Sequence, residues 1–488
     1  MPKRSTTLAL TLPPRPPGAA ATRWLYGALR AEILEGRLRP GARLPATRDL
    51  ARQYGLSRGT IVSAFAQLSS EGYVEGTIGS GTRVSEVLPD DLLHTGPSEP
   101  VPKARSRRLL SSYGRRVELF PAYRARPIRA FRADQPALDL FPTTLWAQLA
   151  ARRMRRATTG LLLGTSPMGY GPLREAVADY VRTARGVQCT ADQIAIVSGV
   201  QEALDLVTRL FVDPLDRVCM EDPGYPGAAL VFEARGARVL GLSVDDEGMT
   251  IPRGRARLAY VTPGHQFPLG ISMSLRRRLA LLEWASGSGA MILEDDYDSE
   301  YRYSGRPVPA LQGLDRRGIV LFAGSFSKVL FPSLRLGYLV VPSDLIDVVT
   351  ATLSITSRHA PLIDQAILAD FLIEGHFARH VRRMREIYAE RLAVLMESAR
   401  THLAGLLAIS GLEAGLQTAA WVADGIDAQA AARAAAVRDV EVTPLAWYTR
   451  GRRPRVIRQG LHLGFAAVDV PEIRRGVRDL AVALESLS

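Results

Sequence analysis

Apolar residues follow two patterns along the chain: a helical spacing near the N-terminus and short continuous runs further on. Near the N-terminus the spacing is helical: Ile61, Phe65 and Leu68 share one face of a helix predicted from residue 57 to 70. Further helices are expected at 24–34 and around 47–54. The glycine-containing segment 75–84 is expected to form a short β-hairpin. The pattern therefore predicts three helices followed by a hairpin.

Beyond this region the chain contains short apolar runs that end in glycine or in acidic residues. Residues 194–197 precede Ser198-Gly199, and residues 290–293 precede a run of carboxylates that starts at Glu294. Buried strands with polar groups at their C-terminal ends are typical of α/β folds, which build their ligand sites there. We expect an α/β domain for this larger part of the chain.

The polar face of the predicted 57–70 helix suits contact with DNA. Because the apolar face must point to the core, Arg58 and Thr60 lie on the other side, and Ser57 can cap the helix N-terminus. This arrangement is a helix-turn-helix, in which the first turn of the last helix touches base edges or phosphates in a major groove. The following hairpin would be its wing.

Charge favours the same interpretation. Residues 1–84 contain 12 Lys and Arg against 5 Asp and Glu, so +7 of the formal net charge of +13 lies in the first sixth of the chain. Such an excess supplies sequence-independent affinity for the phosphate backbone, although a solubilising basic tail is the alternative. We expect Arg48 to contact DNA together with Arg58, and Arg43 and Arg83 to contact phosphates.

One lysine in the larger part has an informative set of neighbours. Lys328 follows Ser325 and Ser327 and stands seven residues before Arg335. A lysine amine can form a Schiff base with an aldehyde, hydroxyls can bind phosphate oxygens, and arginine offers phosphate a planar double donor. Together these residues indicate a pyridoxal 5′-phosphate site. A surface lysine in a serine-rich loop is the alternative.

Two further residues stand about thirty positions before this lysine. Asp295, at the end of a predicted strand, can pair with the pyridine nitrogen of the cofactor and keep it protonated. The Tyr297 phenol can reach the ring oxygen. For the acidic cluster taken alone, a solvated strand end or a cation site is the alternative.

A phosphate cradle is predicted further upstream. A strand, a Ser-Gly turn and a helix start are expected around Gly199, and free N–H groups at a helix N-terminus bind anions. We therefore assign Gly199, Val200 and Gln201 to the phosphate. Tyr225 lies on a Pro/Gly turn after another short strand, from which it can stack on the pyridine ring.

These motifs occur in the order typical of a known family. Residues from about 128 to 488 resemble the fold-type I aminotransferases, which have a large α/β/α lobe and a small lobe. The resemblance implies a homodimer, in which Tyr170 of the loop Gly169-Tyr170-Gly171 reaches the phosphate of the neighbouring subunit.

The N-terminal segment resembles the winged helix of GntR-type regulators. The matching residues are Pro40-Gly41, Leu44-Pro45, Arg48-Asp49-Leu50-Ala51 and Ser57-Arg58-Gly59-Thr60. Joined to the aminotransferase-like half, the segment resembles the MocR/GabR family of pyridoxal phosphate-dependent transcription regulators. We therefore expect a winged helix-turn-helix DNA-binding domain at 1–84, a basic, proline-containing linker at 85–127, and an aminotransferase-like effector domain at 128–488.

Two positions depart from the aminotransferase pattern. Many of these enzymes carry an arginine before Leu-x-Phe near the C-terminus, which binds the substrate carboxylate, but His462 stands at that place. Binding of a ligand carboxylate would then fall to His462, to a nearby arginine or to no residue. The nearby arginines are Arg450, Arg452, Arg453 and Arg455. Phe267 replaces the asparagine that usually contacts the ring oxygen.

Composition narrows the setting further. No run of eighteen uncharged apolar residues occurs and no signal-peptide core follows the first residues, so we expect a cytoplasmic protein. Cys189 and Cys219 are too few for a disulfide framework, and no His/Cys cluster has the spacing of a metal site.

These observations lead to one functional hypothesis and two alternatives. We expect a homodimeric regulator that binds a double-stranded DNA operator and pyridoxal 5′-phosphate and senses a vitamin B6 vitamer, an amine or an amino acid, with catalysis at most vestigial. The first alternative is an active aminotransferase with an appended DNA-binding domain. The second is an enzyme whose winged helix binds another protein.

Overall fold

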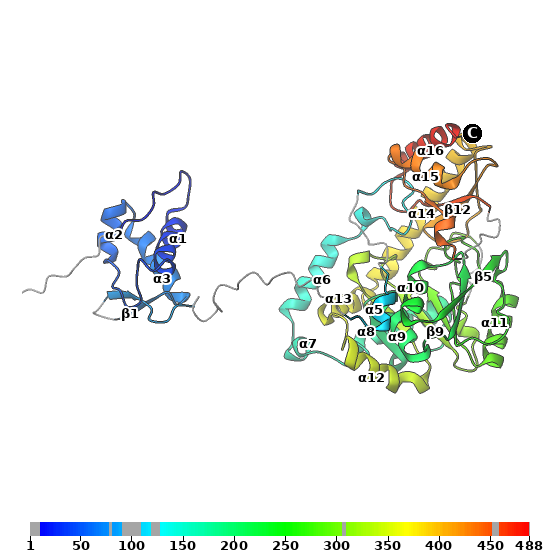
Figure 1. Cartoon of the computed structure of the whole chain (residues 1–488), viewed down its shortest axis with the longest axis horizontal. Coiled ribbons are helices and arrows are strands. Elements are labelled where there is room, and N and C mark those ends of the chain that lie inside the picture. The colour runs from blue at the N-terminus through cyan, green and yellow to red at the C-terminus, as the bar shows by residue number, and fades with distance from the viewer. Residues whose placement is uncertain are drawn as a thin grey trace, which may run out of the picture. The chain divides into compact units, whose positions relative to one another are not determined.

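The chain forms two compact units, Met1–Arg108 and Leu109–Ser488 (Figure 1). The computed structural model describes residues 10–77, 81–89, 109–118, 127–304, 309–450 and 458–487. Each unit has a hydrophobic core of its own.

The first unit is a winged helix-turn-helix, as predicted. It consists of α1 (Ala21–Leu34), α2 (Thr47–Tyr54), α3 (Arg58–Ser70) and the antiparallel strands β1 (Val74–Thr77) and β2 (Gly81–Val84). Ile61, Phe65 and Leu68 of α3 are buried, which confirms the predicted core face. The residues between the two strands, 78–80, lie outside the described part of the chain.

Residues on both sides of this motif complete its core. Leu10 and Leu12 are buried with the helices, and the Tyr54 hydroxyl donates to the Leu10 carbonyl oxygen at 2.5 Å and accepts from the Leu12 N–H at 2.9 Å. Leu88 is buried in the same cluster. The packed unit thus continues past residue 84, where the sequence analysis places the end of the domain.

The second unit is built on an eight-stranded sheet. Its order is β3 (Ile194–Val197), β10 (Gly337–Val340), β9 (Val320–Ser325), β8 (Met291–Asp296), β7 (Leu258–Val261), β4 (Arg217–Asp222), β5 (Arg238–Asp245) and β6 (Gly248–Met249). The five strands from β9 to β5 run parallel to their neighbours, β10 is antiparallel to both β3 and β9, and β6 is antiparallel to β5. Parallel strands end at one edge, so their C-terminal residues converge there.

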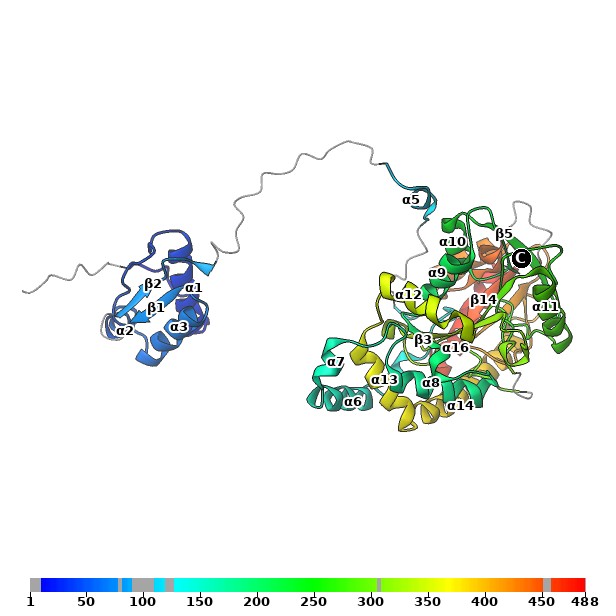
Figure 2. The ribbon, with the colours of Figure 1, turned by 90° about the horizontal axis from the view of Figure 1, so that it is seen from below.

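Helices cover both faces of this sheet (Figure 2). Successive strand residues point to opposite faces, and those of β3 belong alternately to two core clusters: Ala195 and Val197 to one, Ile194 and Ile196 to the other. The first cluster contains α9 (Val200–Phe211) and α10 (Pro226–Arg235); the second contains α8 (Gly171–Arg185), α13 (Leu362–Ile373) and α14 (His376–His402). α11 (Leu275–Ser288) packs on the strands nearer β6. Burial on both faces explains why the strands read as continuous apolar runs.

A smaller antiparallel sheet forms the second lobe. Its order is β11 (Leu407–Ile409), β12 (Gln417–Val422), β14 (Gly460–Gly464) and β13 (Thr443–Pro444). α15 (Ala428–Val437), α16 (Val470–Glu485) and the 27-residue α14 pack with it. This arrangement confirms the expected fold class.

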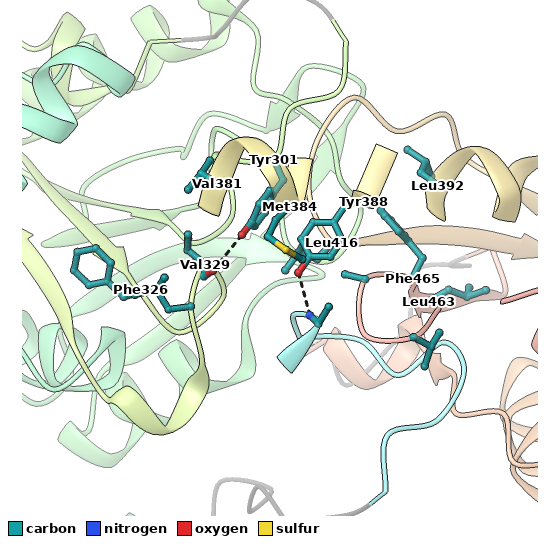
Figure 3. Packing of buried hydrophobic residues seen from close by; sticks show 14 of the residues in the cluster. Tyr301, Phe326, Val329, Val381, Met384, Tyr388, Leu392, Leu416, Leu463 and Phe465 are labelled. Atoms are coloured by element: carbon teal, nitrogen blue, oxygen red, sulfur yellow. Dashed lines mark hydrogen bonds between the residues drawn. The ribbon is translucent and has the colours of Figure 1, made fainter. Parts of the chain in front are cut away.

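The two lobes share one continuous core (Figure 3). The Tyr301 hydroxyl donates to the Val329 carbonyl oxygen at 3.3 Å, and the Tyr388 hydroxyl of α14 accepts from the Ala137 N–H at 3.0 Å. Val329 follows the predicted cofactor lysine directly. The turn that carries this lysine is therefore fixed to the core between the lobes.

The predicted linker contributes to both units. Within it, α5 (Ser112–Arg116) packs on α10, and the Arg116 guanidinium donates to the carbonyl oxygens of Ala234 and Arg235, both at 3.1 Å. These carbonyls belong to the last turn of α10, where a cation complements the helix dipole. Residues 90–108 and 119–126 lie outside the described part of the chain.

Candidate functional site

Lys328 lies in the turn that follows β9, and its amine has an aspartate as partner. Lys328 Nζ donates to the backbone oxygen of Asp134 at 2.7 Å and to Asp134 Oδ1 at 2.9 Å. Before it in the same turn, the Ser327 N–H donates to Ser325 Oγ at 3.2 Å. The lysine side chain is 23% exposed, so it remains accessible from solvent.

Asp134 is held by the small lobe. Phe131 and Gly464 of β14 form an antiparallel bridge, and Gln417 Oε1 of β12 accepts from the Asp134 N–H at 2.8 Å. The Asp134 backbone has φ 69°, a left-handed conformation that aspartate tolerates better than most residues. Burial raises the pKa of the Asp134 carboxyl, but the Lys328 ammonium, His462 and hydrogen bonds outweigh it and leave that pKa below its ordinary value.

Asp295 stands one residue before the end of β8, as the sequence analysis expects. The Tyr260 hydroxyl donates to Asp295 Oδ2 at 2.7 Å, whereas Oδ1 is buried and has no hydrogen-bond partner among the described residues. Burial raises the pKa of Asp295 to about 7, and the carboxylates of Asp296 and Asp298 act in the same direction. A positively charged donor at Oδ1 would oppose this shift.

The other acidic residues of this cluster have partners of their own. Asp296 forms a buried ion pair with Arg185 at 2.6 Å, and Asp298 lies 2.9 Å from His265 Nδ1. Glu294 accepts from two backbone N–H groups at 2.8 Å. Alternation along β8 explains this division, because Asp295 faces the side opposite to its neighbours. The described residues contain no group of three or more His, Cys, Asp or Glu side chains that could hold a metal ion.

The predicted phosphate cradle comes together in the structure. Gly199 has φ 94° and immediately precedes α9, and a Cβ at this position would lie 3.6 to 3.7 Å from the Arg335 guanidinium. Glycine therefore leaves room between this guanidinium and the first N–H groups of α9, those of Val200 and Gln201, which have no carbonyl acceptor within the helix. The Gln201 amide donates to the Tyr225 hydroxyl at 3.1 Å, while Gln201 Oε1 is buried without a partner among the described residues.

A cluster of aromatic rings is centred on Phe267 and includes Tyr225, the hydrogen-bond partner of Gln201. Phe267 makes edge contacts with Tyr225, Tyr297, Tyr448 and His462, at centroid distances of 5.7, 5.9, 5.1 and 5.5 Å. The Tyr297 hydroxyl lies 3.0 Å from His265 Nδ1. Burial, followed by the charge of Asp298, raises the pKa of Tyr297 well above its ordinary value, so the phenol keeps its proton.

His462, at the position where the resemblance leads us to expect an arginine, is fully buried on β14. Its Nδ1 lies 3.0 Å from the Tyr448 hydroxyl, and its Nε2 has no hydrogen-bond partner in the described part of the chain. Burial lowers the pKa of His462 to about 4. The imidazole is therefore uncharged at neutral pH and offers a ligand carboxylate no positive charge.

Of the four arginines expected near His462, the structure describes one, Arg450, and this residue has partners of its own. Arg450 forms an ion pair with Glu233 of α10, and its backbone N–H donates to Asp222 at 3.2 Å. Arg452, Arg453 and Arg455 lie outside the described residues.

Tyr170 is not joined to the other predicted residues by its described contacts. It precedes α8, its backbone N–H donates to Gln365 Oε1 at 2.8 Å, and its ring packs at the margin of the main core. A role at a neighbouring subunit's phosphate, as the resemblance implies, stays a prediction.

The predicted DNA-contacting residues of the first unit are solvent-accessible. Arg58 is exposed in the first turn of α3, and Ser57 caps that helix by accepting from the Thr60 N–H at 3.1 Å. Arg48 is exposed on α2. Arg43 and Arg83 are exposed and face each other across a backbone bridge beside the wing. Within the described part of the chain, no helix combines the length and apolar composition needed to cross a membrane.

Sequence reasoning missed several residues that complete the site. Asp134, Tyr260 and Tyr448 belong to none of the motifs quoted above, and each reaches the site through packing of distant segments. An aspartate in a loop, two residues before a proline, gives only a weak turn signal.

Comparison with known proteins gives the same two parts. A family model described as "Bacterial regulatory proteins, gntR family" matches residues 22–84. The chain is 41% identical over 469 residues to the probable rhizopine catabolism regulatory protein MocR of Rhizobium meliloti, covering 95% of this chain and 94% of that protein. It is 32% identical over 399 residues to the HTH-type pyridoxine biosynthesis transcriptional regulator PdxR of Corynebacterium glutamicum, covering 80% and 81%.

Among solved structures, the second unit is similar to LysN, an α-aminoadipate aminotransferase from Thermus thermophilus complexed with N-(5′-phosphopyridoxyl)-L-leucine. The TM-score is 0.67 at 28% sequence identity, covering 74% of this chain and 92% of that chain. The second unit thus has the fold of an aminotransferase, and the first unit of the same chain is a winged helix of the GntR type. The chain belongs to the MocR/GabR family of GntR-type transcription regulators.

Proposed function

We propose that this protein is a pyridoxal 5′-phosphate-dependent transcription regulator that acts as a homodimer on double-stranded DNA and responds to a vitamin B6 vitamer, an amine or an amino acid. The observation that carries the cofactor assignment is Asp295, a buried carboxylate with one oxygen lacking a partner among the described residues. Its pKa is raised by burial, which means that the protein alone does not stabilise its charge. A protonated pyridine nitrogen is the donor this oxygen lacks.

The other end of the site suits a phosphate group. Gly199, the start of α9 and the Arg335 guanidinium enclose a space that a Cβ on Gly199 would reduce. Backbone N–H groups at a helix start and a guanidinium are the donors that bind phosphate esters. Ser325 ends β9 and Ser327 immediately precedes Lys328, and both would add hydroxyl donors.

When bound, pyridoxal phosphate supplies an aldehyde that joins covalently to primary amines and a ring that withdraws electrons. Lys328 would hold it by its amine, and Asp295 would keep a proton on the ring nitrogen. Tyr225 would cover one ring face, and Tyr297 would present its hydroxyl, which keeps its proton because burial raises the phenol pKa.

The DNA-binding role rests on the first unit. Arg58 is exposed and Thr60 is half-buried in the first turn of α3, the turn that a recognition helix presents to the major groove. A chromosomal DNA partner would place this role in the cytoplasm.

A homodimer is supported by apolar side chains on the surface of the second unit. Leu162 and Leu163 of α7 (Thr159–Leu163) are 63% and 82% exposed, and Ile355 of α12 (Ile346–Thr356) is 84% exposed. The end of α7 adjoins the residues after α12, because Gly164 lies beside His359. Burying this surface against a second copy, with Tyr170 reaching the partner's phosphate, would assemble the site.

The proposal is tested by loading and by DNA selection. The purified protein should bind one pyridoxal phosphate per chain, and borohydride reduction should attach it to Lys328 in a peptide identified by mass spectrometry. Lys328→Ala should abolish that attachment. Selection from a random duplex library should then yield a preferred sequence for the same preparation. Absence of both cofactor binding and a preferred DNA sequence would refute the proposal.

A further inference from the structure

We propose that Asp134 makes this site select amines that carry a second ammonium or hydroxyl group and no carboxylate. The inference rests on the function proposed above and specifies its effector class. Amino acids, the usual ligands of the aminotransferase fold, would then be discriminated against by charge.

The first support is the position of the Asp134 carboxylate. Its Oδ1 lies 2.9 Å from Lys328 Nζ, the atom that a ligand amine would displace from the cofactor's carbonyl carbon. The Asp134 side chain is 41% exposed, so it is within reach of a ligand from solvent. A carboxylate has about four acceptor positions, and one lysine does not fill them.

The second support concerns the charges near His462: among the described residues, the cation that acts on His462 is Lys328 itself, the amine that would be joined to the cofactor, and no arginine is among the described contacts of His462. His462 is fully buried, and its low pKa leaves it uncharged at neutral pH. Arg450 is paired with Glu233, and Arg335 lies beside Gly199 at the phosphate end. The neutral His462 has a buried Nε2 without a described partner, which suits a hydrogen bond with a neutral polar group such as a hydroxyl.

The third support is that the fold fixes this carboxylate in place. Asp134 sits in a left-handed conformation at φ 69°, its N–H is bonded to Gln417, and the preceding residues pack tightly on Gly464. A Cβ on Gly464 would lie 2.2 Å from the Arg132 carbonyl oxygen, so this segment cannot shift without disturbing β14. Asp134 is therefore a built part of the site.

Charge then determines which ligands are favoured. A ligand carboxylate would have to approach the Asp134 carboxylate with no arginine of the described residues to compensate its charge, whereas an ammonium or hydroxyl group would donate to it. For a partly exposed group, this difference corresponds to about tenfold or more in affinity or capture rate.

The experiment uses the full-length protein with bound pyridoxal phosphate, whose content is measured first by absorbance. Three aminooxy probes differ only in the end group: O-(2-aminoethyl)hydroxylamine, O-(2-hydroxyethyl)hydroxylamine and aminooxyacetate. Each captures the cofactor's carbonyl carbon and frees the Lys328 amine, so every preparation yields a rate constant. Dividing by the rate constant with free pyridoxal phosphate removes the intrinsic reactivity of each probe.

We expect the wild type to favour the ammonium probe over aminooxyacetate by about tenfold or more, with the hydroxyl probe also ahead of aminooxyacetate. Asp134→Asn keeps the shape and tolerates positive φ, and it should bring the ratio to within about threefold of unity. His462→Arg should shift selectivity toward aminooxyacetate. Asp139→Asn, which changes an exposed aspartate five residues away, should leave the ratio unchanged.

Two results would overturn the inference: a corrected wild-type rate that favours aminooxyacetate, or an unchanged ratio in Asp134→Asn. If Asp134→Asn loses its cofactor, the inference is still tested by the corrected rate ratio of the wild type and by the change of that ratio in His462→Arg. A wild-type protein that binds no pyridoxal phosphate would instead refute the proposed function, so the two failures are distinguishable before any probe is added.

Discussion

The Tyr260 hydroxyl donates a 2.7 Å hydrogen bond to one oxygen of Asp295 and leaves the other oxygen buried without a partner among the described residues. Tyr260 comes from β7 and Asp295 from the adjacent parallel strand β8, so the hydrogen bond fixes the carboxylate where the strands end. The protein orients this carboxylate but supplies a hydrogen-bond donor to only one of its oxygens. This is the state expected of a residue that binds a ligand.

The first prediction follows from this half-satisfied carboxylate. Asp295→Asn should weaken pyridoxal phosphate binding by about 10- to 100-fold, because it removes a hydrogen bond between charged groups. Titration of cofactor absorbance measures the effect. Asp246→Asn, an exposed aspartate of the same unit, is the control and should bind as the wild type does. Equal affinity in both variants would remove Asp295 from the cofactor site.

The second prediction concerns pH and the cofactor-free protein. Burial raises the pKa of Asp295 to about 7 from an ordinary value of 3.8. A carboxyl with a raised pKa in the folded state costs stability when it ionises, so the cost is absent below about pH 4 and complete above about pH 7. Asp295→Asn should therefore raise the melting temperature of the cofactor-free protein more at about pH 8 than at about pH 5.

Glu221 provides the comparison for this pH test. Burial raises its pKa to about 7 as well, and it stays in the variant, so part of the pH dependence should persist. A melting temperature increase of equal size at both pH values would show that ionisation of Asp295 carries no cost.

The third prediction separates base reading from phosphate contact. Arg58→Ala should cost about 1 to 3 kcal/mol on the selected operator and relax sequence preference, because Arg58 is exposed at the start of α3. Arg83→Ala, on strand β2 of the wing, should weaken binding to all duplexes alike. Fluorescence anisotropy with operator and scrambled duplexes distinguishes the two. Equal losses on both duplexes for Arg58→Ala would exclude it from base reading.

The fourth prediction is that turnover is slow or absent. His462 is uncharged at neutral pH and cannot bind a substrate carboxylate as arginine does. Common amino acid and keto acid pairs should therefore react well below the ordinary enzyme range of about 1 to 1000 per second, as measured by coupled assays. Steady turnover within that range would favour the alternative of a working aminotransferase.

The fifth prediction tests the coupled dimer on DNA. Two winged helices fixed to one dimer require operator half-sites on the same side of the duplex, separated by whole turns of about 10 base pairs. Inserting about 5 base pairs between half-sites should reduce affinity, and inserting about 10 should restore it. Equal binding at all three spacings would mean that the two DNA-binding units act independently.

Sequence reasoning worked where structure is local. Helical spacing placed α3 and its core face, and apolar runs placed β3 and β8, because both patterns depend on neighbours in the chain. Motif residues such as Lys328 and Asp295 were found because the residues next to them in the sequence indicate their chemistry. The roles assigned to them stay predictions.

The remaining features depend on contacts between distant segments. Asp134 meets Lys328 across 194 positions, and Tyr260 meets Asp295 through strand register. Arg116 docks on α10 from within a segment whose composition predicts a solvated linker. None of these contacts produces a periodic pattern of residues in the sequence. They can be recognised only in the folded chain.

The contact between Lys328 and Asp134 also joins two sheets. Lys328 follows β9 of the eight-stranded sheet, whereas the strand-like residues before Asp134 pair with β14 of the small lobe. A covalent bond at the lysine nitrogen necessarily alters its contacts with Asp134, because a bonded nitrogen has fewer hydrogens to donate. If Lys328 holds the cofactor as we propose, the nitrogen that carries the cofactor would also be the atom that ties the two lobes together at Asp134. A change at this nitrogen would then act on the small lobe directly, through one contact.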